Sequence, residues 1–220
     1  MGLVFVHSGV TDAREWDGVR AIFGLDRTSA PDLWNAADRV ATVLASFADS
    51  ATLVGTSFGG RIVLETALTA PERVTRLVLI NANPFGWSDD VAAVGAEEDE
   101  LFAAGRLDDA AELMVRWWLV GRRRELDDVP TAVRAVAFEL ARRTYDVEEP
   151  GGGVELDLAR VRMPVLVVRG ELDWPDVERA AHRFVQELPD AREVVIEGTA
   201  HLPTLERPDE VARVIREFVG

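Results

Sequence analysis

The sequence has no cysteine among its 220 residues. This absence excludes disulfide bonds, zinc sites with cysteine ligands and catalysis by a thiol. Positive charge is also scarce, because 24 basic residues face 39 acidic ones and the net charge is −15. Nucleic acids and anionic membrane surfaces are both bound through basic side chains, so this composition argues against either partner.

Long hydrophobic runs are missing as well. No apolar stretch approaches the roughly 18 residues of a membrane-spanning helix, and residues 1–10 lack the basic region of a signal peptide. The sequence therefore predicts a cytoplasmic protein without a membrane partner. Its length and its hydrophobic content of 48% suit one α/β domain or two small domains with a buried core.

Short apolar runs recur along the chain, as expected for strands that are buried on both faces. They occupy residues 3–6, 51–54, 76–80, 164–168 and 192–196. Stretches with helical spacing of apolar residues lie between or after them, at residues 40–47, 177–184 and 211–218. Alternating strands and helices predict an α/β fold, with a mostly parallel sheet flanked by helices.

Residues 84–150 break this alternation, because they carry helical periods and no strand pattern. The glycine-rich stretch at 148–153 then marks a flexible return to the sheet. The sequence predicts a core made of residues 1–83 and 154–220, with an inserted helical cap at 84–153.

A serine lies between glycines where a predicted strand meets a predicted helix. Gly55-Thr56-Ser57-Phe58-Gly59 matches the G-x-S-x-G pattern of a nucleophile elbow. A serine hydroxyl is a weak nucleophile, so it needs a general base, and the base needs a carboxylate to hold its tautomer.

Only three histidines can supply that base. His201 follows the last predicted strand, at the end of the sheet where α/β proteins bind ligands. His182 falls off the apolar face of its helix and is predicted to be a surface residue. His7 ends the first strand, where its ring is expected to shape a turn.

The carboxylate is expected at the end of another strand. Asp173 follows the buried run at 164–168, and Glu171 remains the alternative acid. With Asp173, the chain order is Ser57, Asp173, His201, which is the order of the nucleophile-elbow hydrolases. Two backbone N–H groups, those of Phe58 and Gly9, are the predicted oxyanion donors.

Four segments of the chain resemble the α/β-hydrolase superfamily, especially its small capped esterases and lactonases. They are VFVHSGVTDAREWD (4–17), LVGTSFGG (53–60), VLVVRGELD (165–173) and GTAHLPTLERPDEVARVIREFV (198–219). The segment FAAGRLDDAAELMVRWWLVG is similar to the cap of members related to enol-lactonases. The resemblance implies that Ser57 is the nucleophile, Asp173 the orienting acid and His201 the general base.

Three departures from that family's pattern stand out. The chain begins almost on the oxyanion strand, Ser8 replaces a common glycine, and residues 17–39 are compressed. Within them, APDL (30–33) resembles the end of a strand. The expected fold is therefore an α/β-hydrolase fold shortened at the N-terminus. Its exposed sheet edge could pair with another chain, which leaves an oligomer open.

Several further side chains have both a functional and a structural interpretation. The predicted substrate-pocket residues are Phe85, Trp87, Trp117, Trp118 and Trp174, with Phe102 as a further candidate, and each could instead pack in the cap or its loop. Arg122, Arg123 and Arg124 are predicted to be solvated surface residues; the alternative is that they anchor a carboxylate of the substrate. EEDE (97–100) is predicted to be a solvated face rather than a metal site, and Glu206 to support a helix start.

These features predict a serine hydrolase that cleaves a small carboxylic ester or lactone through an acyl-enzyme on Ser57. The reaction needs no metal and no organic cofactor. Two alternatives remain: the same triad could serve C–C bond hydrolysis or perhydrolysis, or the chain could be a hydrolase-like binding protein without turnover.

Overall fold

The computed structural model describes residues 2–146 and 156–220, and within them the strands form one parallel sheet. The spatial order is β2-β1-β3-β4-β5-β6. The strands are β1 (Gly2–Val6), β2 (Thr28–Ser29), β3 (Ala51–Thr56), β4 (Val74–Ile80), β5 (Val165–Gly170) and β6 (Ala191–Ile196). Each predicted apolar run therefore overlaps a strand, whereas the two-residue edge strand β2 was not predicted.

The central strands are apolar throughout because helices cover both faces of the sheet. All six residues of β3 are buried. In the register of the sheet, Val6 of β1 faces Gly55 of β3, and Thr56 of β3 faces Ile80 of β4. The carboxyl ends of these strands thus meet at one edge, and the residues that follow them are neighbours.

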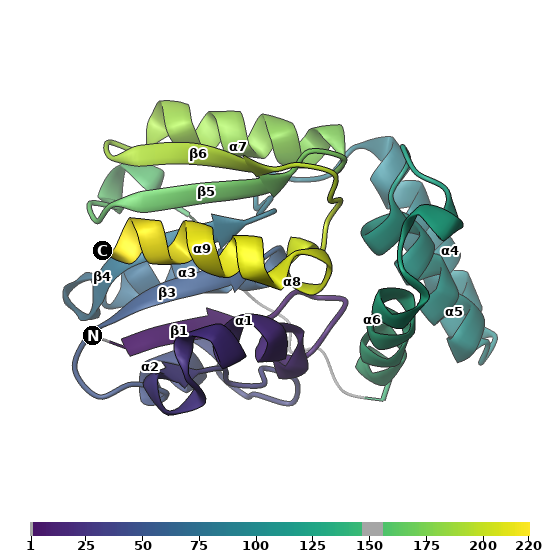
Figure 1. Cartoon of the computed structure of the whole chain (residues 1–220), viewed down its shortest axis with the longest axis horizontal. Helices are drawn as coiled ribbons and strands as arrows, with labels where there is room; N and C mark the ends of the chain where they lie inside the picture. Colours follow the sequence, from purple (N-terminus) through teal and green to yellow (C-terminus); the bar gives the residue numbers. More distant parts are fainter. Residues whose placement is uncertain (1, 147–155) are drawn as a thin grey trace.

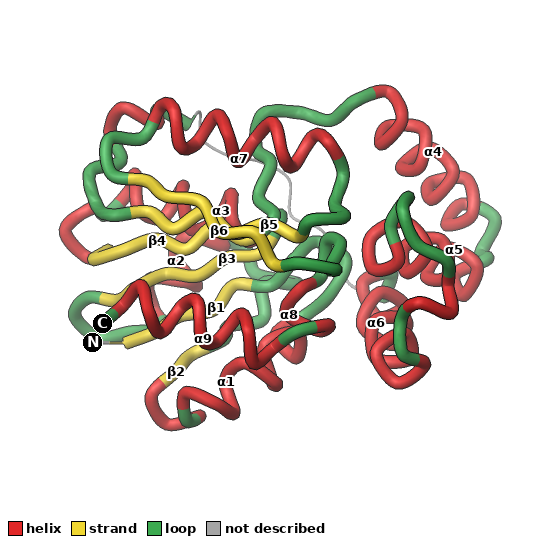
Figure 2. The backbone as a smooth tube through the Cα atoms, turned by 45° about the horizontal axis from the view of Figure 1, so that its top comes forward, coloured by secondary structure: helices red, strands yellow, loops and turns green. Residues whose placement is uncertain are grey.

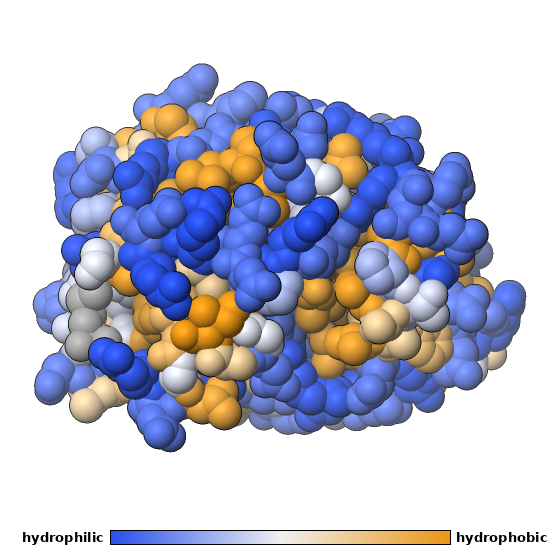
Figure 3. Space-filling view, in the orientation of Figure 1, coloured by the Kyte–Doolittle hydropathy of each residue, from blue (hydrophilic) through white to orange (hydrophobic). Residues whose placement is uncertain are grey.

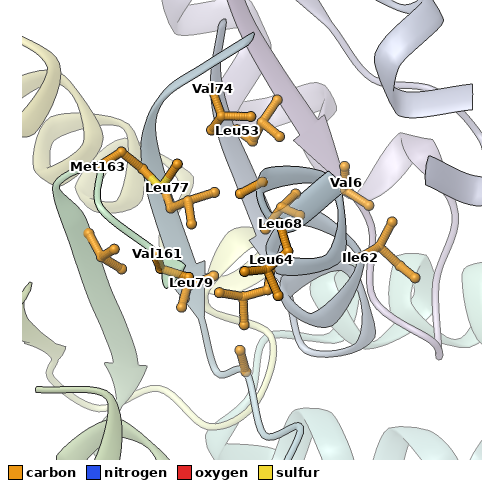
Figure 4. Close-up of a cluster of buried hydrophobic side chains, with 14 of the residues drawn as sticks. Val6, Leu53, Ile62, Leu64, Leu68, Val74, Leu77, Leu79, Val161 and Met163 are labelled. Carbon is orange, nitrogen blue, oxygen red and sulfur yellow. The ribbon is translucent and has the colours of Figure 1, made fainter. Parts of the chain in front are cut away.

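Helices α1 (Asp17–Phe23) and α9 (Pro208–Val219) cover one face of the sheet, which confirms the expected α/β architecture. Helices α2 (Arg39–Ala45), α3 (Phe58–Thr69) and α7 (Pro175–Glu187) cover the other face (Figure 1). Figure 4 shows the cluster beneath α3, where Ile62, Leu64 and Leu68 of the helix lie with side chains of the strands.

The predicted cap region is helical. It contains α4 (Asp89–Ala103), α5 (Leu107–Met114), a π-helical turn at Val115–Val120 and α6 (Thr131–Thr144). These helices lie together at the end of the molecule toward which the strands point (Figures 1 and 2). The remaining helices are α8 (Pro203–Glu206) and the short 3₁₀ turns η1 (Ala13–Trp16), η2 (Leu25–Arg27), η3 (Pro71–Arg73), η5 (Leu126–Asp128) and η6 (Leu158–Arg160).

Hydrophobic contacts join the cap helices to the core. Met114 and Ala141 share a cluster with Trp174 and Val177 at the start of α7. A second cluster brings residues of the π-helical turn together with Leu202. The division into a core and a cap at 84–153 stays a prediction, and the expected return at 148–153 lies outside the described residues.

The sheet edge formed by β2 is short. Only two pairs, Leu3 with Thr28 and Val4 with Ser29, join it to β1. The expectation of a strand end at 30–33 is wrong, because β2 ends at Ser29 and residues 30–33 lie outside any strand. In the described ranges, no helix is long and apolar enough to cross a bilayer. The face shown in Figure 3 is mostly hydrophilic, with hydrophobic side chains in smaller patches.

Candidate active site

Ser57 lies in a strained turn between β3 and α3. Its φ and ψ are 52° and −115°, a combination that costs energy for any residue with a side chain. The flanking glycines explain how the turn forms. A Cβ on Gly55 would lie 2.3 Å from the Gly59 carbonyl oxygen, and one on Gly59 would lie 2.3 Å from the Val6 carbonyl oxygen. The backbone approaches too closely for any other residue type.

The three predicted triad side chains meet at this turn. His201 Nε2 lies 2.8 Å from Ser57 Oγ, and His201 Nδ1 lies 2.8 and 3.0 Å from the two carboxylate oxygens of Asp173. The side chains of His201 and Asp173 are each only 2% exposed. With Asp173 ionised, the Nδ1 proton is held on the carboxylate side. The Nε2 lone pair then accepts the serine hydroxyl, which is the geometry of a serine nucleophile with its base.

The alternative acid, Glu171, points elsewhere. Its Oε2 accepts the Gly198 N–H at 2.9 Å in an exposed position. Asp173 instead accepts the Trp174 N–H at 2.7 Å, which fixes the carboxylate against the imidazole. Of the two candidate acids, Asp173 is the one that contacts the histidine.

The two predicted oxyanion donors are adjacent. Phe58 is the first residue of α3, and a Cβ on Gly9 would lie 3.4 Å from the Phe58 Cβ. Both residues line the cavity that contains Ser57. A helix N-terminus at this point adds a favourable field for developing negative charge.

A buried carboxylate shapes the turn that carries Gly9. Glu15 is 1% exposed, and its Oε2 accepts the Ser8 N–H at 2.8 Å and the Thr11 hydroxyl at 2.5 Å. Its Oε1 accepts the Thr204 hydroxyl at 2.8 Å. The Ser8 hydroxyl in turn lies 2.8 Å from Thr11 Oγ1. The serine that replaces the common glycine is therefore part of a satisfied network.

The other two histidines have structural positions. His7 Nε2 accepts the Leu33 N–H at 3.0 Å, and its Nδ1 lies 2.8 Å from the Ser8 carbonyl oxygen, so the ring joins two loops. The side chain of His182 is 54% exposed. Both placements match the sequence-based expectations.

Asn81 is a buried residue that sequence reasoning missed. Its amide nitrogen donates to the carbonyl oxygens of Ala200 and His201 at 3.1 and 2.8 Å. Its side-chain oxygen accepts the Gly170 N–H at 2.8 Å. One side chain therefore ties the histidine loop to the end of β5. The sequence offers one signal, an asparagine directly after a buried strand. In the structure its φ is 48°, which asparagine adopts more readily than most residues.

The π-helical turn contacts the histidine directly. The His201 N–H donates to the Trp118 carbonyl oxygen at 3.1 Å, and the two rings lie 4.5 Å apart. Nearby, Glu206 accepts the Ala200 N–H at 3.1 Å and pairs with Arg124 at 2.6 Å. The predicted surface role of Arg124 is wrong, because its side chain is only 11% exposed.

Arg122 and Arg123, unlike Arg124, are exposed, as the sequence predicted. Arg122 pairs with Asp90 at 2.9 Å, and both side chains are about half exposed or more. Arg123 donates to the exposed Glu171 carbonyl oxygen at 3.3 Å. Glu206 ends α8 rather than starting a helix, so its role is to hold the histidine loop and Arg124.

A cavity of about 520 Å³ opens above Ser57 and His201. Aromatic side chains dominate its walls: Trp34, Phe58, Trp87, Phe102, Trp118 and Tyr145. Glu98 and Asp99 of α4 complete one side. The stretch 97–100 was expected to be a solvated face, and Glu97, Asp99 and Glu100 are exposed, whereas Glu98 is only partly exposed.

Of the five predicted pocket residues, the structure places Trp87 and Trp118 in the cavity lining. Phe85 lies elsewhere, with its ring 4.9 Å from that of Phe184 in the core. Trp117 packs 5.5 Å from Trp174, and Trp174 is 3% exposed. Phe85 therefore packs against the core, and Trp117 and Trp174 pack against each other.

The model of the alpha/beta hydrolase family matches residues 3–214. The pimeloyl-[acyl-carrier protein] methyl ester esterase of Aliivibrio salmonicida is 27% identical over 199 residues, covering 83% of this chain and 73% of the relative. The enzyme of the same name from Serratia marcescens is 23% identical, covering 99% and 93%.

Among solved structures, naproxen esterase from Bacillus subtilis superimposes with a TM-score of 0.75 at 19% identity, covering 100% of this chain and 83% of that one. This likeness shows the fold. The match of the family model along nearly the whole sequence shows more, and the chain belongs to the alpha/beta hydrolase family.

Proposed function

We propose that this protein is a serine hydrolase that cleaves a small carboxylic ester or lactone, with Ser57, His201 and Asp173 as its catalytic triad. The observation that carries the proposal is the hydrogen-bonded chain from Ser57 Oγ through the His201 imidazole to the Asp173 carboxylate, at 2.8 Å on each side of the ring. The curated relatives named above are ester hydrolases, which supports the same reaction class.

The geometry supports a two-stage reaction. As Ser57 Oγ attacks the ester carbonyl, His201 Nε2 takes the hydroxyl proton, and the Phe58 and Gly9 N–H groups stabilise the oxyanion. The imidazolium returns that proton to the leaving alcohol, which departs and leaves an acyl group on Ser57. A water molecule then attacks the acyl-enzyme with His201 again as base, and the acid is released as Ser57 regains its proton.

The cavity favours small substrates. Its volume of about 520 Å³ accommodates a compact acyl and alcohol pair, and its aromatic walls bury apolar parts of such a molecule. The triad is equally able to start C–C bond hydrolysis or perhydrolysis, but no residue described here favours either reaction over ester cleavage.

The test compares the purified protein with Ser57→Ala. We expect p-nitrophenyl acetate and butyrate to be hydrolysed by the wild type, and turnover to fall by about 10⁴-fold or more in the variant. A fluorophosphonate probe should add once to the wild type, by intact mass, and not to Ser57→Ala. A folded wild-type protein with neither adduct nor serine-dependent turnover would show instead a binding protein with an inherited triad.

A further inference from the structure

The active-site cavity has an uneven distribution of charge. Its catalytic end is formed by Ser57 and His201, with the rings of Trp87 and Trp118 lying 5.4 Å apart beside them. Its cap end carries the carboxylates of Glu98 and Asp99 on α4. Among the residues that line it in the described part of the chain, none is a lysine or an arginine.

Aromatic rings accompany the acidic end of the cavity. Phe102 and Tyr145 lie with their ring centroids 5.7 Å apart, and the Tyr145 hydroxyl donates to Glu98 at 2.5 Å. Burial, together with this hydrogen bond, raises the pKa of Tyr145 well above its usual value, so the phenol stays neutral. Neutral aromatic faces beside carboxylates are the combination that binds organic cations.

The nearby arginines are engaged by other carboxylates, although the charge of Arg142 also acts on Tyr145. Arg143 pairs with Asp12 and with Asp32, and Arg142 pairs with Asp108 and Asp146. Asp99, by contrast, makes no hydrogen bond or ion pair within residues 2–146 and 156–220, and it is an exposed residue that lines the cavity. Its charge is therefore available to a ligand.

The net charge of the whole molecule also favours a cationic ligand over an anionic one. A net charge of −15 attracts cations toward the protein and repels anions, and a concave site concentrates that field. An ester with a carboxylate would meet Asp99 at the cap end as a like charge, whereas an ester with an ammonium group would meet it as an opposite charge.

We propose that the cavity selects esters that carry a positively charged ammonium group, which binds between the Phe102–Tyr145 ring pair and the Asp99 carboxylate while the ester carbonyl lies at Ser57. This inference rests on the proposed ester hydrolysis and names its substrate class. Cation–π contact and one partly exposed carboxylate together correspond to a preference of about tenfold over a neutral substrate of the same shape.

The test uses two esters that differ in one atom of their alcohol. Butyrylcholine carries a trimethylammonium group, and 3,3-dimethylbutyl butyrate carries a tert-butyl group of nearly the same shape. We expect kcat/KM to be about tenfold higher for the cation, and this ratio to decrease as ionic strength rises. Asp99→Asn should lower the ratio to about threefold or less. Glu100→Gln is the matched control, because Glu100 is exposed on the same helix outside the cavity lining.

A ratio of one or below in the wild type, or a ratio unchanged by Asp99→Asn, would overturn the inference. Binding is measured separately, by calorimetry of phenyltrimethylammonium with Ser57→Ala, which does not depend on turnover. Saturable binding that weakens severalfold in Ser57→Ala/Asp99→Asn supports the cation subsite even if no ester is hydrolysed. Hydrolysis of the neutral ester without any ammonium binding would leave the proposed function intact and remove this subsite.

Discussion

Asp173 and Glu171 show, at the scale of single residues, how hydrogen bonds choose between two acids at the same strand end. Both follow β5, yet only Asp173 reaches His201 Nδ1, at 2.8 Å, while Glu171 accepts the Gly198 N–H at 2.9 Å. The side chain of Asp173 is also 2% exposed, so its charge acts on the imidazolium with little screening by water.

Asp173→Asn is expected to lower kcat by about 10³–10⁴-fold, because the amide no longer holds the Nδ1 proton and the imidazole loses its catalytic tautomer. Glu171→Gln should stay within about twofold of the wild type. Steady-state kinetics on p-nitrophenyl butyrate measure both, with circular dichroism as the check on folding. A reversal of these two results would assign the acid to Glu171.

The meeting of the three side chains of the proposed triad was predictable at this scale. The glycines around Ser57 and the order of Ser57, Asp173 and His201 along the chain are local signals that survive without a structure. The contacts of Asn81 and Tyr145 could not be predicted in this way, because their partners lie in loops and helices far away in sequence. A single sequence cannot show which distant carbonyl or carboxylate will face them.

At the scale of elements, the π-helical turn at Val115–Val120 carries two adjacent tryptophans with different surroundings. The Trp118 ring lies 4.5 Å from His201 and 6.1 Å from Trp174, whereas the Trp117 ring packs 5.5 Å from Trp174. A π turn changes the residue spacing, and such turns are frequent at functional sites. No residue pattern predicts where the helix widens.

Glu206 connects Arg124, which follows the π-helical turn, to the loop that carries His201. We expect this contact to affect both the stability of the fold and the rate of the reaction. Glu206→Gln removes the charge that pairs with Arg124 and weakens the bond to the Ala200 N–H. We expect the free energy of unfolding to fall by about 1–3 kcal/mol. As a positioning residue, Glu206 should affect kcat by about threefold to tenfold and leave KM nearly unchanged.

Urea unfolding and steady-state kinetics measure these effects. The control is Glu210→Gln, which removes a half-exposed pair with Arg213 at 3.6 Å and should change stability by less than about 0.5 kcal/mol. If the free energy of unfolding fell equally in the two variants, Glu206 would contribute no more than an ordinary surface charge.

At the scale of the whole molecule, every positively charged side chain other than histidine is an arginine. All 24 basic residues are arginine, so the positive charges do not titrate in the ordinary pH range. Asp12 is a point where separate parts of the chain meet: it is 1% exposed and pairs with Arg14 beside it and with Arg143 of α6. Burial acts to raise the pKa of Asp12, but hydrogen bonds from Arg14 and Arg143 outweigh it and hold the pKa below its ordinary value of 3.8.

This depressed pKa predicts how Asp12 contributes to stability as pH changes. A carboxyl whose folded pKa lies below its unfolded value stabilises the fold above about pH 4, and the contribution disappears as pH falls through the folded pKa. Asp12→Asn is therefore expected to lower stability by about 1–2 kcal/mol at pH 7, a figure reduced because both arginines are partly exposed. Thermal unfolding from pH 3 to 7 should show the difference between wild type and variant shrinking toward the acid end. A difference independent of pH would mean that packing, rather than charge, holds this site.

The order of elements was the most predictable part of the molecule, because each buried parallel strand leaves a continuous apolar run in the sequence. The exception is β2, where Thr28 and Ser29 form two pairs with β1 and leave no pattern. The cavity walls were the least predictable. Trp34 and Asp99 come together from a loop and a cap helix, and only tertiary packing determines which aromatic side chains line the space and which fill it.

The bond from the His201 backbone N–H to the Trp118 carbonyl oxygen makes the π-helical turn a neighbour of the proposed general base through its backbone as well as its ring. A substitution that returned residues 115–120 to ordinary α-helical spacing would move this carbonyl, and with it a support of the His201 backbone. The shape of the cavity wall and the position of the proposed base are therefore coupled, so a redesign of the wall that Trp118 forms would also alter the setting of the base.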